Sequence, residues 1–404
     1  MTDHSGSSGV PAPTPPTRIC IVYDCRYPVS HGGAEKWLGS LARALVSHGA
    51  RVTYVHGAGR GEEQRDGVRW IGLSDASDLY TPAGIRRSLP VGRFSYRVSR
   101  YLRSHGCDFD LVYVHDMPIF PVLGAWWGLR RTRTPWVAEW IEWWGAPYWR
   151  SYAGTVTGTI GFLVQRLALA VTRLAVCYSD LTAEALKAAR PTMPIARLAG
   201  QADCPSEASP DKMPLANPLT PPEQPLAVFL GRFVPHKRAQ LAVDAMLHAR
   251  ATIPGLRLIL IGNGPEEAAL RERAAAIGHG SVEVRTGASD AAVRDALCRA
   301  SVLVHPSARE GFGLVVSEAN SLGVPVVLVA GPDNAAPELI REGGGITVAN
   351  ADPRELSDAI VTIIRSGETA RREALANAER LCREHSVARS SQELLEIAHR
   401  LQDQ

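Results

Sequence analysis

Two glutamates eight positions apart, Glu310 and Glu318, flank a glycine-rich turn and are the residues best suited to do chemistry in this sequence. Gly311 and Gly313 let the backbone approach a ligand closely, and the helix expected after them points its first N–H groups at an anion. Carboxylates on both sides of an anion site can accept hydrogen bonds from hydroxyl groups. The segment therefore predicts a sugar-nucleotide site, with the diphosphate at the helix start. A capped helix with solvated glutamates is the alternative interpretation.

A second candidate segment contains Arg232 and Lys237 directly after an apolar run that predicts a strand. A forked guanidinium and a compact ammonium can together neutralise a leaving diphosphate without a metal ion. A basic loop in solvent is the alternative interpretation. Only four of the 44 basic residues are lysines, which favours a functional role for the lysines that are present, Lys237 among them.

Three weaker signals complete the candidate site. Gly32 and Gly33 precede an expected helix and permit close approach to a phosphate or a sugar, but the loop lacks the GxGxxG pattern of a nicotinamide or flavin site. Gly262 follows an expected strand in a tight turn that would line the same cleft. His115 ends another strand, where it could hydrogen-bond a substrate hydroxyl or be a purely structural histidine.

Seven of the nine tryptophans lie between Trp126 and Trp149, and the stretch from Trp136 onward also contains Glu139 and Glu142. Aromatic faces with interleaved carboxylates can grip a sugar ring or a large apolar acceptor. A tryptophan-rich core strand followed by a loop explains the composition equally well. A peripheral membrane contact is a third interpretation, because tryptophan favours interfaces.

The elements that must position these residues alternate between short β-rich apolar runs and helical patterns, which is typical of parallel sheets with crossover helices. Seven prolines between Cys204 and Pro225 predict a linker. We expect a disordered tail (1–17), a first α/β domain (18–204), the linker (205–225) and a second α/β domain from 226. The expected strands are 18–23, 51–55, 110–115, 135–140, 174–179, 226–230, 256–261, 282–285, 302–305 and 324–328, and the expected helices are 33–49, 238–251, 265–277, 291–299 and 314–321.

Composition excludes several classes of protein. With 404 residues, 45% of them hydrophobic, and a net charge of +3 from 44 basic and 41 acidic residues, the chain is typical of a globular enzyme and not of a nucleic-acid-coating protein. No apolar run approaches the ~18 residues that span a bilayer. The seven scattered cysteines argue against a disulfide framework or a metal site, and the first residues do not form a signal peptide. We expect a cytoplasmic protein.

The chain resembles the retaining glycosyltransferases of family 4, which have the GT-B fold. The resemblance extends from about Arg18 to the end, and two departures stand out: 198–203 replaces a short turn common in the family, and the segment from Trp136 to Trp149 is not a general family feature. The motifs occur in family order: Gly32-Gly33-Ala-Glu, Gly231-Arg232…Lys237, Gly262-Asn-Gly264-Pro-Glu266 and Glu310-x7-Glu318.

The resemblance implies a fold and a reaction. Two Rossmann-like, doubly wound domains would face each other across a cleft, the acceptor side in the first and the nucleotide-sugar site in 226–385, with a C-terminal helix (386–404) crossing back onto the first domain. A hexose-type sugar would move from a UDP- or GDP-linked donor, with retention and without metal or cofactor. The acceptor hydroxyl would belong to a glycan, a lipid-linked glycan or a specialised metabolite.

The resemblance also implies a role for each candidate residue. Glu310 would touch the donor sugar, which His115 also approaches, and Glu318 would bind the ribose hydroxyls. Arg232 and Lys237 would bind the diphosphate. The residues expected to act in catalysis are Glu310, His115, Lys237 and Arg232. Those expected to bind the donor are Gly32, Gly33, Arg232, Lys237, Gly262, Gly311, Phe312, Gly313, Leu314 and Glu318.

The sequence indicates no carboxylate of the first domain poised as a nucleophile. We therefore expect same-face displacement, in which the departing phosphate accepts the acceptor's proton and Arg232, Lys237 and the helix start stabilise the charge that develops. Two alternatives stay open. One is another GT-B activity, a nucleotide-sugar epimerase or a phosphorylase, although the four lysines offer no clear Schiff-base candidate. The other is a non-catalytic nucleotide-sugar-binding protein.

Overall fold

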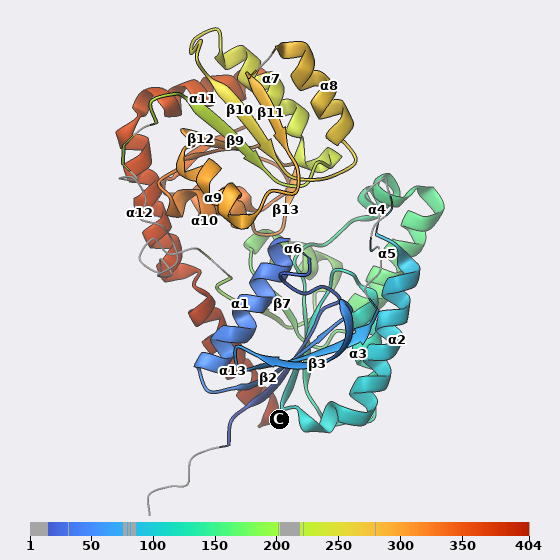
Figure 1. Cartoon of the computed structure of the whole chain (residues 1–404). Coiled ribbons are helices and arrows are strands. Elements are labelled where there is room, and N and C mark those ends of the chain that lie inside the picture. The colour runs from blue at the N-terminus through green and yellow to red at the C-terminus, as the bar shows by residue number, and fades with distance from the viewer. Residues whose placement is uncertain are drawn as a thin grey trace, which may run out of the picture.

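Two α/β domains lie one above the other in the computed structural model (Figure 1), which describes residues 15–30, 32–75, 79, 81, 86–200, 202, 219–220, 222–278 and 280–403. Each domain is built on one parallel-type sheet, as the alternation of elements predicts. The predicted tail lies largely outside the described residues, and so does most of the predicted proline-rich linker.

The first sheet has eight strands in the order β3-β4-β2-β1-β5-β6-β7-β8, and only the β3–β4 pair is antiparallel. Side chains alternate between its two faces: Ile19 and Ile21 pack toward α1, whereas Cys20 and Val22 pack toward α2, α3 and α5. The strands are β1 (Arg18–Val22), β2 (Arg51–His56), β3 (Gly59–Arg65), β4 (Val68–Ser74), β5 (Leu111–His115), β6 (Trp136–Glu139), β7 (Ala175–Cys177) and β8 (Ile195–Arg197). The helices are α1 (Gly33–Ser47), α2 (Ser88–His105), η1 (Gly106–Asp108), α3 (Phe120–Leu129), α4 (Ala146–Ala153), α5 (Thr155–Val171) and α6 (Asp180–Ala189).

The second sheet has six parallel strands in the order β11-β10-β9-β12-β14-β16, and a two-stranded sheet, β13–β15, lies beside it. The strands are β9 (Leu226–Leu230), β10 (Arg257–Ile261), β11 (Val282–Arg285), β12 (Val302–His305), β13 (Arg309–Glu310), β14 (Val326–Val329), β15 (Asp333–Asn334) and β16 (Gly345–Val348). The helices are η2 (Pro235–Lys237), α7 (Ala239–Ala249), α8 (Glu267–Ile277), α9 (Asp290–Cys298), α10 (Leu314–Ser321), η3 (Ala336–Ile340), α11 (Pro353–Ser366) and α12 (Glu368–Glu384).

The last helix, α13 (Val387–Gln402), returns to the first domain, as the resemblance implies. It continues from α12 down one side of the molecule and packs beside α1 (Figure 1), with Leu394 and Ile397 buried. The Oγ atom of Ser391 lies 2.7 Å from Nδ1 of His48 on the first domain. The N–H of Gly200 donates to Oγ of Ser390 at 2.8 Å, so the chain crosses between the domains at two adjacent places.

All the predicted strands and helices are present, with ends within two residues of those predicted. The sequence analysis missed the β3–β4 hairpin, the strands β8, β13, β15 and β16, and the helices α2 to α6, α11 and α12. It also gave no sign of a disulfide, yet Cys382 is disulfide-bonded, whereas the five other described cysteines are free. None of the described helices is both long and apolar enough to cross a membrane.

Candidate active site

The wall of the cleft formed by the second domain carries a charged cluster of Lys237, His305 and Glu310. Lys237 follows β9 through η2, His305 ends β12, and Glu310 lies on β13, so the carboxyl edge of the sheet brings the three together. Lys237 Nζ forms an ion pair with Glu310 Oε1, and His305 Nε2 lies 2.5 Å from the same oxygen. The side chains of Lys237 and Glu310 are 17% and 12% exposed, so a ligand can still reach them.

Glu310 stays charged in this setting. Burial alone would raise the pKa of its carboxyl group, but Lys237 and His305 outweigh burial and hold the pKa well below its usual range. The backbone of the loop is fixed as well: the N–H of Ala335 donates to the carbonyl oxygen of Glu310 at 2.9 Å, and Asn334 Nδ2 donates to the carbonyl of Ser307 at 2.9 Å. A pre-positioned carboxylate of this kind can accept hydrogen bonds from sugar hydroxyls.

The turn after Glu310 requires glycine. Gly313 has a φ of +96°, and a Cβ atom there would lie 2.8 Å from Cβ of Ala336. It precedes Leu314, the first residue of α10, and no side chain caps that helix start. The ring of Phe312 packs between the domains, its centroid 6.3 Å from that of Tyr178 and 5.5 Å from that of His385, and the predicted donor contact of this residue stays a prediction.

Glu318 lies on α10, half-buried and across the cleft from Lys36 of α1. Burial would lower the pKa of Lys36, but the carboxylates of Asp290 and Glu318 outweigh it and raise the pKa. Lys36 Nζ lies 2.9 Å from Asp290 Oδ1. The sequence analysis did not propose Lys36, although the scarcity of lysine could have pointed to it.

Arg232 and Gly262 lie in two loops that pack tightly together. A Cβ atom at Gly262 would lie 1.8 Å from the carbonyl oxygen of Gly231, so only glycine fits there, and the N–H of Phe233 donates to the carbonyl of Asn263 at 2.8 Å. Arg232 is exposed at the edge of the cluster. The predicted donor contacts of both residues stay predictions. The close packing explains why a glycine stands at position 262 without any contact to the donor.

The wall formed by the first domain is built around a buried carboxylate. His115 ends β5 and Glu139 ends β6, and the two residues are partners in the strand register. His115 Nδ1 lies 2.6 Å from Glu139 Oε2, and the other carboxylate oxygen accepts hydrogen bonds from Trp37 Nε1 at 2.9 Å and from the Tyr178 hydroxyl. Tyr178 in turn lies 2.5 Å from the hydroxyl of Tyr113.

This network holds the histidine ring in one orientation. The side chains of His115 and Glu139 are 1% and 0% exposed. Burial would lower the pKa of His115, but Glu139 outweighs it and raises the pKa. Because Nδ1 is hydrogen-bonded to Glu139, Nε2 is the ring nitrogen that can form a hydrogen bond with a ligand. The predicted contact of His115 with the donor sugar stays a prediction.

The sequence analysis did not propose two further carboxylates of the first domain, Asp116 and Glu142, as site residues. Asp116 is fully buried, which raises the pKa of its carboxyl group to about 8. Glu142 interacts electrostatically with Lys237 and Glu310 across the cleft, and burial raises its pKa. The expectation that no first-domain carboxylate is poised as a nucleophile stays a prediction. One oxygen of Glu142 has partners, since Trp144 Nε1 donates to Oε2 at 2.9 Å and Arg309 lies 3.5 Å from the same atom.

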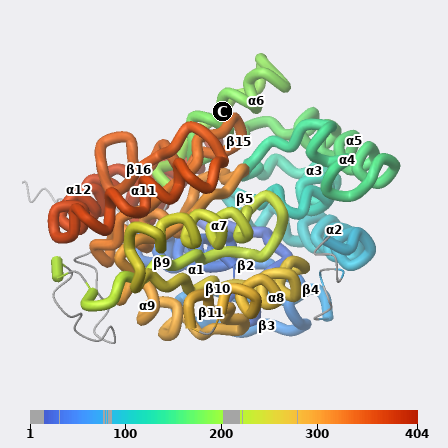
Figure 2. The backbone as a smooth tube through the Cα atoms, turned by 90° about the horizontal axis from the view of Figure 1, so that it is seen from above, coloured from blue at the N-terminus to red at the C-terminus, as the bar shows by residue number. Residues whose placement is uncertain are grey.

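The two walls touch. A Cβ atom at Gly311 would lie 2.3 Å from Cγ2 of Ile141, and one at Gly33 would lie 3.2 Å from Cδ1 of Leu314. Gly32 is the N-cap residue of α1 beside it. The structure therefore brings the predicted glycine-rich turns of both domains together. Figure 2, which looks at the molecule from above, shows α1 beneath the second domain.

The tryptophan-rich segment divides between core and cleft. Trp136 and Trp140 are buried in the core of the first domain, as the core-strand interpretation predicts. Trp144 is half-buried in an aromatic cluster, its ring centroid 4.7 Å from Tyr148 and 5.2 Å from Tyr152. The Tyr148 hydroxyl lies 3.2 Å from His236 Nδ1, so this part of the segment forms the rim of the cleft.

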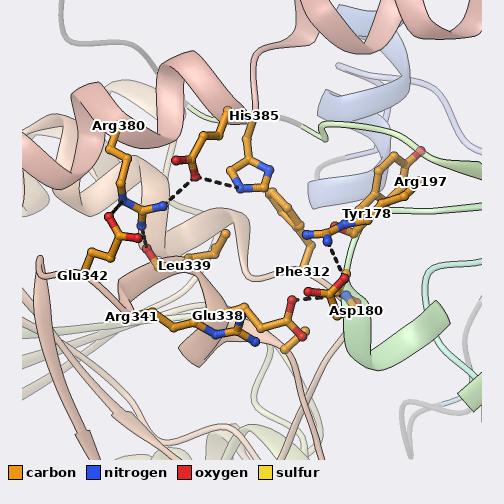
Figure 3. Close-up of a pocket in the computed structure, with 13 residues that line it drawn as sticks. Tyr178, Asp180, Arg197, Phe312, Glu338, Leu339, Arg341, Glu342, Arg380 and His385 are labelled. Atoms are coloured by element: carbon orange, nitrogen blue, oxygen red, sulfur yellow. Dashed lines mark hydrogen bonds and ion pairs between the residues drawn. The ribbon is translucent and has the colours of Figure 1, made fainter. Parts of the chain in front are cut away.

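A pocket of about 250 Å³ is lined by residues of both domains, Phe312 among them (Figure 3). Its charged groups largely neutralise one another: Arg197 pairs with Asp180, and Arg380 pairs with Glu384 at 2.6 Å. Phe312 is the one predicted site residue among the described residues that line it, so the pocket is distinct from the charged cluster around Glu310. Within the described part of the chain, no group of His, Cys, Asp or Glu is arranged to hold a metal ion.

Two family models match the chain, one in each domain. The model described as "Glycosyltransferase Family 4" matches residues 31–196, and the model described as "Glycosyl transferases group 1" matches residues 215–380. The two matches divide the chain near the predicted linker.

Named relatives and solved structures agree with these models. A GDP-mannose-dependent mannosyltransferase of phosphatidylinositol monomannoside from Mycolicibacterium smegmatis is 31% identical over 35% of this chain and 38% of its own length. A similarly named enzyme from Corynebacterium glutamicum, which acts on the monoacylated form, is 28% identical over 39% of this chain and 42% of its own. The chain thus spans less than half the length of either curated relative. The sucrose-phosphate synthase structure from Thermosynechococcus elongatus matches 95% of this chain and 99% of its own, with a TM-score of 0.75 and 18% identity. The chain belongs to the GT-B glycosyltransferases of the family 4 type.

Proposed function

We propose that the protein is a retaining glycosyltransferase that moves a hexose-type sugar from a nucleotide diphosphate to a hydroxyl group of a lipid-linked glycan acceptor. The observation that carries the proposal is the cluster of Lys237, His305 and Glu310 beside the start of α10, held against the first-domain wall. A charged carboxylate, a nearby ammonium and free helix N–H groups are the groups that a hexose diphosphate needs.

In the proposed reaction, cleavage of the sugar–phosphate bond leaves negative charge on the diphosphate. Lys237, Arg232 and the start of α10 stabilise that charge, while Glu310 holds the hexose through its hydroxyl groups. The departing phosphate oxygen accepts the proton of the acceptor hydroxyl on the same face of the sugar. The proposal assigns no nucleophile to the first domain, and Trp144 and Arg309 both contact Oε2 of Glu142.

The names of the relatives support the acceptor class. Two of them act on phosphatidylinositol monomannosides, and a third, from Komagataeibacter xylinus, acts on a cellobiosyl-diphosphopolyprenol. The donors differ, since these relatives use GDP-mannose whereas a structurally similar Anabaena protein was solved with UDP and glucose. Both GDP- and UDP-linked sugars therefore belong in the first test.

The test begins with thermal stabilisation of the purified protein by a panel of nucleotide diphosphates and nucleotide sugars. We expect one nucleotide sugar to stabilise the protein selectively and Glu318→Ala to lose that shift. In turnover assays with that donor, Glu310→Gln and Lys237→Ala should each lower kcat by about 10²-fold or more. Lys187→Ala, which alters an exposed lysine on α6, is the matched control and should leave turnover unchanged.

The alternatives predict different products. An epimerase would convert the donor with no acceptor present. A non-catalytic protein would bind the donor but neither hydrolyse nor transfer it. Turnover in Glu310→Gln and Lys237→Ala close to that of the unchanged protein would overturn the assignment of the site.

A further inference from the structure

The large apolar side chains that the first domain exposes are concentrated on one side. Of the ten exposed large hydrophobic residues in the described part of the chain, eight lie on α2, α3 and α5, and only Val29 and Leu247 lie elsewhere. These three helices cover the face of the first sheet opposite α1 and α13, and Figures 1 and 2 both show them together on that side. Monomeric proteins rarely gather exposed apolar residues in this way without a binding role.

The exposed residues of α5 form a continuous stripe. Val156, Ile160, Leu163 and Leu167 follow one another at intervals of four, three and four, and their exposed fractions are 74%, 56%, 58% and 51%. Such spacing places all four on one face of the helix, and that face points to solvent instead of the core. Arg166 lies exposed at the edge of the stripe.

The same side of the domain is strongly basic. Helices α2, α3, α4 and α5 contain no aspartate or glutamate, although the whole chain has nearly balanced charges. On α2 the exposed stripe mixes apolar or aromatic residues with basic ones: Leu89, Arg93, Tyr96, Arg100 and Arg103. A surface of this kind, apolar in the middle and formed by helices that carry no acidic residue, complements an anionic and partly apolar partner.

On α3 the exposed residues are Trp126 and Trp127, and three arginines follow directly at 130, 131 and 133. The guanidinium of Arg130 lies 3.6 Å from the ring centroid of Trp127. Tryptophan and arginine side by side suit the boundary between the headgroups and acyl chains of a bilayer.

We propose that this side of the first domain, formed by α2, α3 and α5 and called here the basic apolar face, docks on the surface of a membrane that contains anionic lipids. A second copy of the chain is a poor occupant, because a two-fold contact would press one arginine-rich face against another.

A protein docked on the membrane through this face would hold its cleft rim near a lipid-linked acceptor. Helix α4 packs against α5 and reaches the cleft rim, where Tyr148 contacts His236. The link to a lipid-linked acceptor rests on the proposed function, whereas binding of the face to a membrane does not.

The test is co-sedimentation of the full chain with vesicles of phosphatidylcholine alone or with about 30% phosphatidylglycerol. We expect binding to the anionic vesicles, weakened in 0.5 M NaCl because salt screens the charges. Ile160→Glu combined with Leu163→Glu should lower the partition coefficient at least tenfold. Arg93→Glu combined with Arg100→Glu should lower it by about the same factor, since each arginine near an anionic surface strengthens binding roughly fivefold.

Matched controls lie on the second domain. Leu247→Glu alters an exposed apolar residue of α7, and Arg365→Glu with Arg383→Glu alters exposed arginines of α11 and α12. Both controls should bind vesicles like the unchanged protein, and all variants should keep its Tm and its nucleotide-sugar binding without vesicles. That last measurement separates failure of the membrane proposal from failure of the proposed function.

Three results would overturn the proposal. One is an unchanged protein that does not bind the anionic vesicles, or binds neutral ones equally well. Another is full binding by the variant that carries Ile160→Glu and Leu163→Glu. The third is sedimentation analysis showing a dimer that the same variant dissociates, which would make the basic apolar face a protein interface.

Discussion

The two walls of the cleft hold their charged groups in different ways, and both would face the sugar nucleotide that we propose as the donor. On the second-domain wall, Lys237 and Glu310 neutralise each other while remaining partly exposed to the cleft. On the first-domain wall, Glu139 is fully buried and acts on the cleft only through His115, whose ring it orients. The first arrangement offers charge to a ligand, whereas the second uses charge to fix a side chain.

The difference has an energetic consequence. Lys237 and Glu310 keep some contact with water, and Glu310 also has His305 as a partner, so the loss of one partner should cost less folding free energy here than at Glu139. A buried carboxylate is tolerated only while its hydrogen bonds are complete, because an unmet buried charge costs several kcal/mol. Substitutions on the second-domain wall should therefore affect turnover more than stability, and substitutions at Glu139 should affect turnover and stability together.

The substitution Glu139→Gln is the most direct test of this difference between the two walls. In the amide one oxygen still accepts and the other is replaced by a donating NH2 group. Because Trp37 Nε1 can only donate, the NH2 group must face His115, whose Nδ1 must become the acceptor, and the ring loses the charge that raises its pKa. We expect kcat/KM to fall about 10²-fold and the free energy of unfolding to fall by about 2 kcal/mol. The measurements are steady-state kinetics with the identified donor and denaturant unfolding.

The pH profile distinguishes positioning from a purely structural role. If Glu139 acts through His115, any limb of the kcat/KM profile that reports His115 should move to lower pH in the variant. Lys237→Ala is the control for stability, because Glu310 keeps His305 as a partner in that variant and the free energy of unfolding should fall by less than in Glu139→Gln. Equal losses of stability in both variants would contradict the contrast between the walls.

The same contrast explains what the sequence could predict. The second-domain wall was identified in advance because Arg232, Lys237, Glu310 and Glu318 lie in short motifs directly after strands, and strand ends of a parallel sheet meet at one edge. Both domains and the return of the last helix followed from the same alternation and from the family resemblance.

The first-domain network could not be predicted in this way. Glu139 meets His115 only because β5 and β6 are neighbours, and it meets Trp37 and Tyr178 from two other elements. Sequence spacing does not reveal which strands become neighbours. Helix α5 was missed for a related reason: apolar residues such as Ile160 lie on its exposed face, so its pattern lacks a clear polar side.

A pair of glycine substitutions tests how closely the walls must meet. Gly311→Ala places a Cβ atom 2.3 Å from Cγ2 and 2.5 Å from the carbonyl oxygen of Ile141, so the walls must separate. Gly33→Ala brings its Cβ within 3.2 Å of the flexible end of Leu314, which can move. We expect kcat/KM to fall about tenfold in the first variant and less than threefold in the second.

The readout that separates closure from folding is small-angle scattering with and without donor. Gly311→Ala should keep the Tm of the unchanged protein within a few degrees but give a larger radius of gyration in the presence of donor. A normal kcat/KM in Gly311→Ala would mean that the contact with Ile141 is not part of the reacting state.

The last prediction concerns the pH dependence of stability and rests on Asp116, beside His115 on the first-domain wall. Its carboxyl group has a pKa of about 8 in the folded protein against 3.8 for an exposed aspartate, chiefly because of burial. Between these values the folded protein keeps a proton that the unfolded chain has lost, so stability falls as pH rises, by up to about 1.4 kcal/mol per pH unit. His115, whose pKa is also raised, contributes a slope of the same sign above its ordinary pKa.

Asp116→Asn separates the two contributions, because it keeps an acceptor for the N–H of Ile141, which lies 3.2 Å from Oδ1, and removes the titrating proton. Urea unfolding between pH 5 and 7 should give the variant a stability that depends less on pH than that of the unchanged protein, with the gap in slope approaching ~1.4 kcal/mol per unit. Parallel curves would mean that Asp116 ionises normally in the folded protein. In that case burial on the first-domain wall would not exclude charge, and its contrast with the Lys237–Glu310 wall would rest on Glu139 alone.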